Sequence, residues 1–243
     1  MPLSGRIFVV AGATSGIGKS CAEEVMRRGG HVFGIGRRAD HPLSGYEAYT
    51  PVQMDLTQSD AIQELKRLLM QNSEISDVIC CVGGGVGAIG DYEQLKMTDI
   101  EDAVTLNVVA PMRLLRGVLP HLRKRESGDV FIVGSEASLR GAKRGSVYAA
   151  TKFAIRGLTQ SLRAEYARYC VRVIGVYPGM TRTPFFEELD FEPGSEEAHA
   201  LLPEDIAVVI ADAAVAPERV VMDEIVLSPR LHVIQSKRKQ GRT

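Results

Sequence analysis

The sequence predicts a single α/β domain over residues 1–243, in which a doubly wound parallel sheet of about seven strands carries helices on both faces. Short runs rich in β-branched residues alternate along the chain with longer stretches of helical periodicity. Most of the short runs are almost continuously apolar, which is typical of strands covered on both faces. The chain is 45% hydrophobic and 24% charged, and no repeat or linker divides it.

The expected elements follow one another in regular alternation. Apolar runs predict strands at RIFVVA (6–11), HVFGIG (31–36), PVQMD (51–55), DVICCV (77–82), DVFIVG (129–134), VRVIGVY (171–177) and RVVMDEIVL (219–227). Helical periodicity between them predicts helices near 16–28, 58–71, 98–125, 147–168 and 203–214.

Two segments fall outside this alternation. Residues 179–202 are long, mixed in composition and weakly periodic. Long irregular segments in compact domains often serve as lids, so we expect this one to cover a site or to be mobile. Residues 236–243 contain the basic run KRKQGR, which we interpret as a solvated tail.

Charge and cysteine usage exclude several classes of function. The formal net charge of -1 provides no general attraction to nucleic acid or to an anionic membrane, so we expect neither as a partner. The cysteines form no C-x-x-C pair, so the sequence suggests neither a metal site nor a disulfide framework. The first apolar run is too short to span a membrane, and we expect a protein of the reducing cytoplasm.

A glycine-rich turn follows the first expected strand. Gly12, Gly16 and Gly18 are spaced G-x-x-x-G-x-G before a helix, which differs from the spacing G-x-G-x-x-G. Glycines at this place let the backbone approach a pyrophosphate, whose charge then faces the helix N-terminus. A turn without a ligand is the alternative, but the position between an apolar strand and a helix favours nucleotide binding.

The end of the second expected strand bears on the choice of nucleotide. Arg37 and Arg38 follow it, and arginine at this place accommodates the 2′-phosphate of NADP, with solvated loop charge as the alternative. Asp40 lies slightly further on and keeps NAD possible. Asp55, at the end of the third expected strand, is a candidate for holding the adenine, or alternatively for starting a turn.

Two tyrosines precede a lysine by four residues, and their surroundings differ. Tyr148 and Lys152 share one face of an expected helix, where a nearby cation favours the phenolate form that general acid/base chemistry requires. Ser135 ends an apolar strand upstream of this pair, where an α/β sheet presents ligand-binding groups. Tyr92 and Lys96 repeat the spacing, but no such partner precedes them.

In chain order, the glycine pattern at 12–18, Asn107 in LNVVAP, Ser135, YAATK at 148–152 and PGMTRT at 178–183 resemble the short-chain dehydrogenase/reductase family. The resemblance covers nearly the whole chain and implies a Rossmann fold and hydride transfer between NADP and a carbonyl or secondary alcohol. It implies that Tyr148 is the acid/base, that Ser135 binds the substrate oxygen and that Lys152 holds the nicotinamide ribose. Asn107 would support a water behind Lys152.

The same resemblance, with the reasoning above, assigns the residues that contact the dinucleotide. They are Gly12, Thr14, Ser15, Gly16, Ile17, Gly18, Arg37, Arg38, Asp55, Leu56, Val82, Gly83, Tyr148, Lys152, Pro178, Gly179, Thr181 and Thr183.

The chain departs from the family pattern in three places. CCVG at 80–83 stands where the family usually has asparagine-asparagine-alanine-glycine, and Ala11 replaces a threonine. A thiol is a weak hydrogen-bond donor, so the adenosine side of the site must be built differently. The C-terminal residues 219–236 resemble the branch of sepiapterin-type and small 3-hydroxy acid dehydrogenases, which favours a small polar substrate.

The substrate end and the assembly are the last expectations. Candidates for substrate contacts, or alternatively for solvated loop charges and lid packing, are Arg140, Lys143, Arg144, Arg182, Phe185 and Phe186. The family commonly forms tetramers in which the helices expected near 98–125 and 147–168 pair across a two-fold interface, so we expect a homo-oligomer, a tetramer or a dimer. The apolar residues of these two helices that are candidates for the interface, or alternatively for packing against the sheet, are Val104, Leu114, Phe153 and Leu158.

Two alternatives to an enzyme stay open. One is a cofactor-sensing regulator that has kept the fold and lost turnover, and the altered CCVG is its support. The other is a nucleic-acid or membrane partner held by the basic tail, which a near-neutral chain does not favour.

Overall fold

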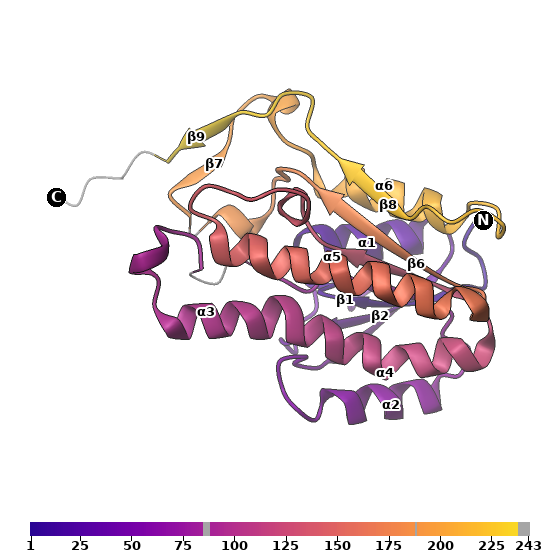
Figure 1. Cartoon of the computed structure of the whole chain (residues 1–243). Helices are drawn as coiled ribbons and strands as arrows, with labels where there is room; N and C mark the ends of the chain where they lie inside the picture. The colour runs from indigo at the N-terminus through magenta and orange to yellow at the C-terminus, as the bar shows by residue number, and fades with distance from the viewer. Residues whose placement is uncertain (85–87, 188, 238–243) are drawn as a thin grey trace.

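A seven-stranded sheet forms the centre of the protein (Figure 1). The structure is a computed structural model and describes residues 1–84, 88–187 and 189–237. The strands are ordered β3-β2-β1-β4-β5-β6-β8, and every neighbouring pair is parallel. Their bounds are β1 Ile7–Ala11, β2 His31–Gly36, β3 Tyr49–Gln53, β4 Asp77–Cys80, β5 Gly128–Val133, β6 Val171–Pro178 and β8 Glu224–Leu227.

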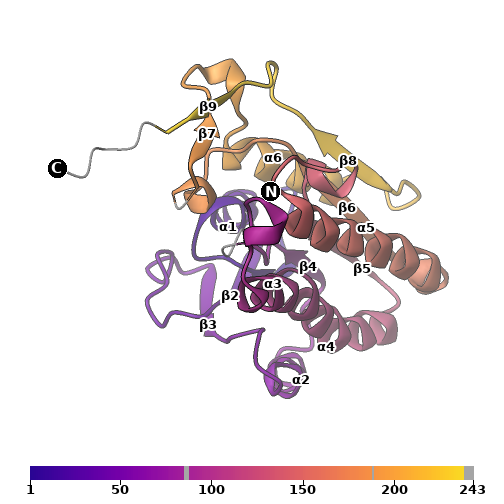
Figure 2. The same cartoon turned by 60° about the vertical axis from the view of Figure 1, so that its left-hand side comes forward.

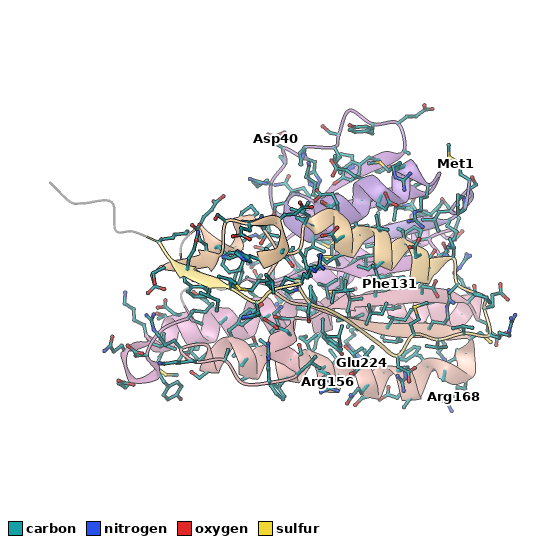
Figure 3. The ribbon with its side chains drawn as sticks, turned by 90° about the horizontal axis from the view of Figure 1, so that it is seen from above. Met1, Asp40, Phe131, Arg156, Arg168 and Glu224 are labelled. Atoms are coloured by element: carbon teal, nitrogen blue, oxygen red, sulfur yellow. The ribbon has the colours of Figure 1, made fainter. Side chains whose placement is uncertain are left out.

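Helices cover both faces of this sheet, so the predicted doubly wound fold is confirmed. On one face, α2 (Ala61–Gln71), α4 (Ala110–Arg125) and α5 (Ser146–Tyr166) enclose an apolar core that includes Leu65, Leu114 and Ile155. On the other face, α1 (Gly16–Arg27) and α6 (Pro203–Ala214) enclose a second core. Phe131 lies in the sheet between the two layers and is fully buried (Figure 3). None of the helices in the described part of the chain is long and apolar enough to span a membrane.

The predicted helix at 98–125 is interrupted. α3 (Met97–Val104) leads into a π-helical turn, Thr105–Val109, before α4 begins. The amide of Ala110 bonds to the carbonyl of Thr105, five residues earlier. Pro111 contributes to the change of pitch because it has no N–H to donate to the carbonyl of Asn107, four residues before it. π-Turns inside helices often mark functional sites.

The predicted strand at 219–227 is correct only in its second half. β8 begins at Glu224, because the chain before it turns around the side chain of Arg172. The guanidinium of Arg172 donates a hydrogen bond to the carbonyl of Val220 at 3.1 Å. Residues 219–222 therefore do not pair with β6. Glu224 is the first residue of β8, and its carboxylate accepts two bonds of 2.9 Å from the guanidinium of Arg156 in α5 (Figure 3).

Two short strands were not predicted. β7 (Phe191–Pro193) lies within the irregular segment 179–202 and pairs antiparallel with β9 (Ile234–Ser236), as Figure 2 shows. Residues 228–237, named here the C-terminal strap, thereby lie along this segment. The predicted tail at 236–243 is therefore wrong at its start, since Ser236 belongs to β9 and the amide of Lys237 bonds to the carbonyl of Asp190 at 2.9 Å. Residues 238–243 lie outside the described part of the chain.

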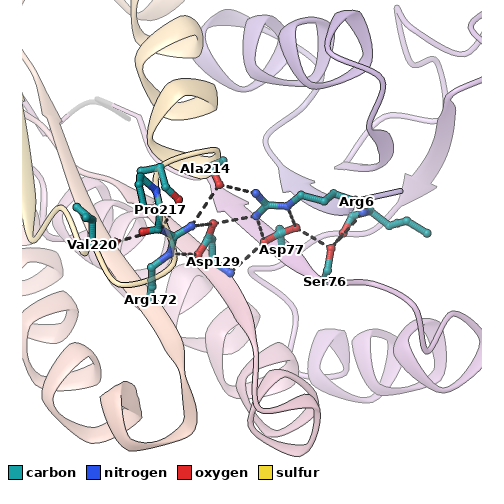
Figure 4. A network of polar contacts seen from close by, with 10 residues as sticks. Arg6, Ser76, Asp77, Asp129, Arg172, Ala214, Pro217 and Val220 are labelled. Atoms are coloured by element: carbon teal, nitrogen blue, oxygen red, sulfur yellow. Dashed lines mark hydrogen bonds and ion pairs between the residues drawn. The ribbon is translucent and has the colours of Figure 1, made fainter. Parts of the chain in front are cut away.

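An ionic network joins the amino ends of four strands, at the edge opposite the carboxyl ends (Figure 4). Asp129, at the start of β5, accepts two bonds of 2.6 Å from Arg172 and one of 2.8 Å from Arg6. Arg6 also bonds to Asp77, at the start of β4, and Asp77 is 1% exposed. Burial raises the pKa of the Asp77 carboxyl above its ordinary value, although the bond from Arg6 opposes the shift.

Candidate active site

A cleft of about 1450 Å³ lies at the carboxyl ends of the central strands. This is the edge at which open α/β sheets bind ligands. Every residue predicted to contact the dinucleotide lines this cleft, from Gly12 at the end of β1 to Thr183 beyond β6. Ser135, Tyr148 and Lys152 line it too, whereas Asn107 lies behind the wall.

The glycine-rich turn packs closely enough to require its glycines. A Cβ placed on Gly18 would lie 2.2 Å from the carbonyl oxygen of Gly12, a distance that no real side chain tolerates. The turn therefore lies tightly against the first turn of α1, which starts at Gly16. A backbone this close to a helix N-terminus fits the pyrophosphate of a dinucleotide.

The arginines after β2 lie at the same cleft, and Asp40 does not. Arg37 and Arg38 line the cleft, and Arg38 donates to the carbonyl of Thr14 in the glycine turn at 3.4 Å. Asp40 is exposed and absent from the cleft wall; Figure 3 shows it at the edge of the molecule. Asp55 lines the cleft and accepts bonds from the amide and hydroxyl of Thr57, at 2.9 and 2.8 Å.

The two thiols of the CCVG segment differ in position, because Cys80 packs in the core whereas Cys81 is half-buried and lines the cleft. Cys80 is buried, and burial raises its pKa to about 12. A hydrogen bond with Cys21, together with burial, raises the pKa of Cys81 well above its ordinary value. Both thiols are therefore neutral, and β4 is held to β1 by backbone bonds such as that from the amide of Cys81 to the carbonyl of Ala11, at 2.9 Å.

Three candidate catalytic side chains, Ser135, Tyr148 and Lys152, line the same cleft. The amine of Lys152 lies 5.5 Å from the ring centre of Tyr148, one helical turn earlier in α5. Phe185 packs tilted against the ring of this tyrosine, with 5.5 Å between ring centres. Ser135 ends the extended run from β5, and its oxygen accepts a bond of 3.2 Å from the amide of Ala137. Among the residues that the structure describes, none accepts the hydroxyl hydrogen of Ser135, so this hydrogen can be donated to a ligand.

Asn107 supports this arrangement from behind. It is fully buried in the π-turn, and its side chain bonds to the amide and carbonyl of Gly84 at 2.8 and 3.0 Å. A Cβ placed on Gly83 would lie 2.7 Å from the amine of Lys152 and 3.0 Å from the Asn107 amide oxygen. The lysine and the asparagine therefore converge on Gly83, and this glycine leaves the space for the Lys152 amine.

The exposed Tyr92 and its lysine have no comparable surroundings. Tyr92 is 65% exposed in a short turn, and Lys96 precedes α3, so the two do not share a helix. Neither lines the cleft.

Only some of the six candidates for substrate contacts line the cleft. Arg140, Lys143, Phe185 and Phe186 line the cleft, whereas Arg144 and Arg182 do not. Arg144 pairs with Asp91 and Asp190, and Arg182 bonds to the carbonyls of Gly194 and Glu196, so both hold loops together.

The sequence did not single out Glu136, His232 and Ile234, which also line the cleft. Glu136 directly follows Ser135, and that adjacency was the available signal. His232 and Ile234 come from the C-terminal strap, which reaches the cleft only through its pairing with residues about forty positions earlier.

Two of the four candidate interface residues pack against the sheet, and two are exposed. Leu114 is fully buried and Leu158 packs against the same core, so both face the sheet. Val104 and Phe153 are 41% and 44% exposed.

Comparisons with known proteins agree with this fold. The chain is 31% identical to the NADP-dependent 3-hydroxy acid dehydrogenase of Schizosaccharomyces pombe, over 93% of each chain. It is 29% identical to the sepiapterin reductase of Chlorobaculum tepidum, over 95% of this chain and 98% of that one. A structure of the closed form of serine dehydrogenase complexed with NADP+ is 25% identical, with a TM-score of 0.82 over 91% of this chain and 94% of that one. A family model described as short chain dehydrogenase matches residues 6–193, and the chain therefore belongs to the short-chain dehydrogenase/reductase family.

Proposed function

We propose that this protein is an NADP-dependent oxidoreductase that interconverts a small polar carbonyl compound and the corresponding secondary alcohol. The observation that carries the proposal is that one cleft contains both the glycine turn and the group of Ser135, Tyr148 and Lys152. The names of the relatives from Schizosaccharomyces pombe and Chlorobaculum tepidum support a reductase or dehydrogenase of small polar compounds.

The nicotinamide, when bound, supplies or accepts the hydride. The hydroxyl of Tyr148 gives its proton to the substrate oxygen during reduction and takes one back during oxidation. Ser135, whose oxygen accepts from the amide of Ala137, uses its O–H hydrogen to donate a hydrogen bond to the same substrate oxygen. The ammonium of Lys152, 5.5 Å from the ring centre of Tyr148, holds the ribose and stabilises negative charge that develops on the phenol. Asn107 fixes Gly84 and supports the water through which Lys152 recovers a proton.

Arg37 and Arg38 take the 2′-phosphate of NADP. Two guanidinium groups at the rim of the cleft favour a dianion, and Asp40 stays outside the cleft wall, so no carboxylate of this loop competes for the 2′-hydroxyl of NAD.

The segment 179–202 acts as a lid. Phe185, in the turn Pro184–Phe186, packs on the ring of Tyr148 and so excludes water from one side of the phenol. The exposed apolar side chains of Val104, in α3, and Phe153, in α5, support a homo-oligomer, a dimer or a tetramer. The protein would work in the cytoplasm.

The test is a panel of ketones, aldehydes and secondary alcohols assayed with both coenzymes, following the absorbance of the reduced nicotinamide. We expect turnover with NADP(H), at a kcat/KM at least about tenfold above that with NAD(H). If folded protein binds NADPH and turns over no member of the panel, the proposal is wrong and the cofactor-sensing regulator replaces it.

A further inference from the structure

Glu136 occupies an unusual position for a carboxylate. It directly follows Ser135, lines the cleft, and its side chain is only 21% exposed. Its carboxyl carbon lies 3.6 Å from the place where a Cβ on Gly179 would be, so it sits beside the loop after β6. The catalytic roles proposed above leave Glu136 without a function, although it is the closest charged neighbour of Ser135 in the chain.

The carboxylate is held in place from two directions. Arg140, one turn later, donates to one oxygen at 2.8 Å, and His232 contacts the other at 3.2 Å. His232 is itself fixed, because the amide of Leu231 bonds to the carbonyl of Ala198 at 2.8 Å and the carbonyl of Val233 accepts from Gly194 at 2.9 Å. The C-terminal strap therefore presents this imidazole to the cleft on an anchored backbone.

An ionised carboxylate has about four lone-pair positions. Within the described part of the chain, one donor reaches each oxygen of Glu136, which leaves acceptor capacity on a group that faces the cleft. An apolar substrate would leave that capacity unmet in a partly desolvated site, whereas a substrate with an added donor would satisfy it.

We propose that Glu136 is a specificity-determining residue that accepts a hydrogen bond from a hydroxyl or ammonium group of the substrate, one or two carbons from the reacting carbon. The inference rests on the proposed function, and it adds the substrate class: hydroxylated or aminated secondary alcohols and their ketones. Arg140 and His232 are positioning residues, which hold the carboxylate toward the cleft.

Matched alcohols of nearly equal shape test the inference. The first series is 2-butanol, 1,2-propanediol and 1-amino-2-propanol, in which one methyl group becomes a hydroxyl or an ammonium. The second series places the group one carbon further: 2-pentanol, 1,3-butanediol and 4-amino-2-butanol. In each oxidation the alcohol carbon gives a hydride to NADP+ and the hydroxyl gives its proton to Tyr148, so the products are a ketone, NADPH and a proton.

For the wild-type protein we expect that, in at least one series, kcat/KM for the diol or the amino alcohol exceeds that for the plain alcohol by about tenfold or more. In Glu136→Gln, which keeps the shape and removes the charge, this ratio falls toward one, and it falls further for the ammonium than for the hydroxyl. Glu187→Gln, at another carboxylate that lines the cleft, should keep the ratio.

The ratio separates recognition from a structural effect, because a variant that merely loosens the site lowers all members of a series together. Wild-type protein that oxidises all three members of both series equally well overturns the inference, as does Glu136→Gln with an unchanged ratio. Failure to oxidise any of these alcohols by a protein that does turn over members of the earlier panel also overturns the inference. Failure with these alcohols and with every member of the earlier panel contradicts the proposed function instead.

Discussion

Gly83→Ala is a small change with a calculable effect on the active site. The added Cβ would lie 2.7 Å from the amine of Lys152, whereas ordinary van der Waals contact begins at 3.4 Å, so the amine must retreat by about 0.7 Å. The amide oxygen of Asn107, at 3.0 Å, must shift as well. In addition, Gly83 has a φ of +154°, which side-chain-bearing residues rarely adopt and which is worth roughly 1–3 kcal/mol of strain.

A misplacement of about 1 Å near the chemistry lowers rates by about a hundredfold, so we expect kcat/KM with NADPH to fall about tenfold to a hundredfold. The melting temperature should fall by about 2–12 °C, and kinetics are therefore measured well below it. The matched control is Gly84→Ala, whose Cβ would meet Leu106 at an ordinary 3.5 Å. A Gly83→Ala variant with wild-type kcat/KM, or one no more impaired than Gly84→Ala, would refute the placement of Lys152.

Three further changes test other parts of the structure. Asp129→Ala leaves the guanidinium of Arg172 without its carboxylate and removes one of the two carboxylates that pair with Arg6. It should lower the free energy of unfolding by about 3–5 kcal/mol in urea titrations, whereas Glu23→Ala, at a surface pair, should change it by less than about 1 kcal/mol. Arg156 lowers the pKa of Glu224 below 4.5, so the stability of this pair is present above about pH 4.5 and is lost as the pH falls through the folded pKa. The difference in unfolding free energy between wild type and Glu224→Gln should therefore shrink below that pH, and a constant difference would contradict it. Arg38→Ser should raise KM for NADPH about tenfold and leave KM for NADH nearly unchanged, and equal changes would argue against a 2′-phosphate contact.

Local patterns in the sequence were sufficient for the sheet and for most of the cleft. The alternation of apolar runs and helical periodicity located the parallel strands, and parallel strands bring their carboxyl ends to one edge. Residues just after β1, β2, β4, β5 and β6 therefore had to meet there. The glycine turn and Ser135 could be placed on this basis.

Features that depend on distant contacts could not be read in the same way. Arg6 and Asp129 resemble the solvated ends of strands, and only the assembled sheet brings them together at 2.8 Å. β9 has three residues, too few for a periodic signal, and its partner β7 lies about forty positions earlier. The contact between Glu136 and His232 depends on that pairing.

The π-turn around Asn107 is an intermediate case. Its helical periodicity is nearly unbroken, so the segment was predicted as one helix. Pro111 was the available signal, since a proline inside a helix removes the bond to the residue four before it, here Asn107. What could not be predicted is that the turn would direct this asparagine to Gly84.

The most direct test of the account is turnover by Tyr148→Phe, with Tyr92→Phe as the control for loss of a phenol elsewhere. Tyr148→Phe should still bind NADPH, measured by fluorescence, because the ring and Lys152 remain. Its kcat for an accepted carbonyl should fall by about 10²–10⁴-fold, and Tyr92→Phe should match the wild type. A Tyr148→Phe variant that retains wild-type kcat would contradict the assignment of this phenol as the acid/base.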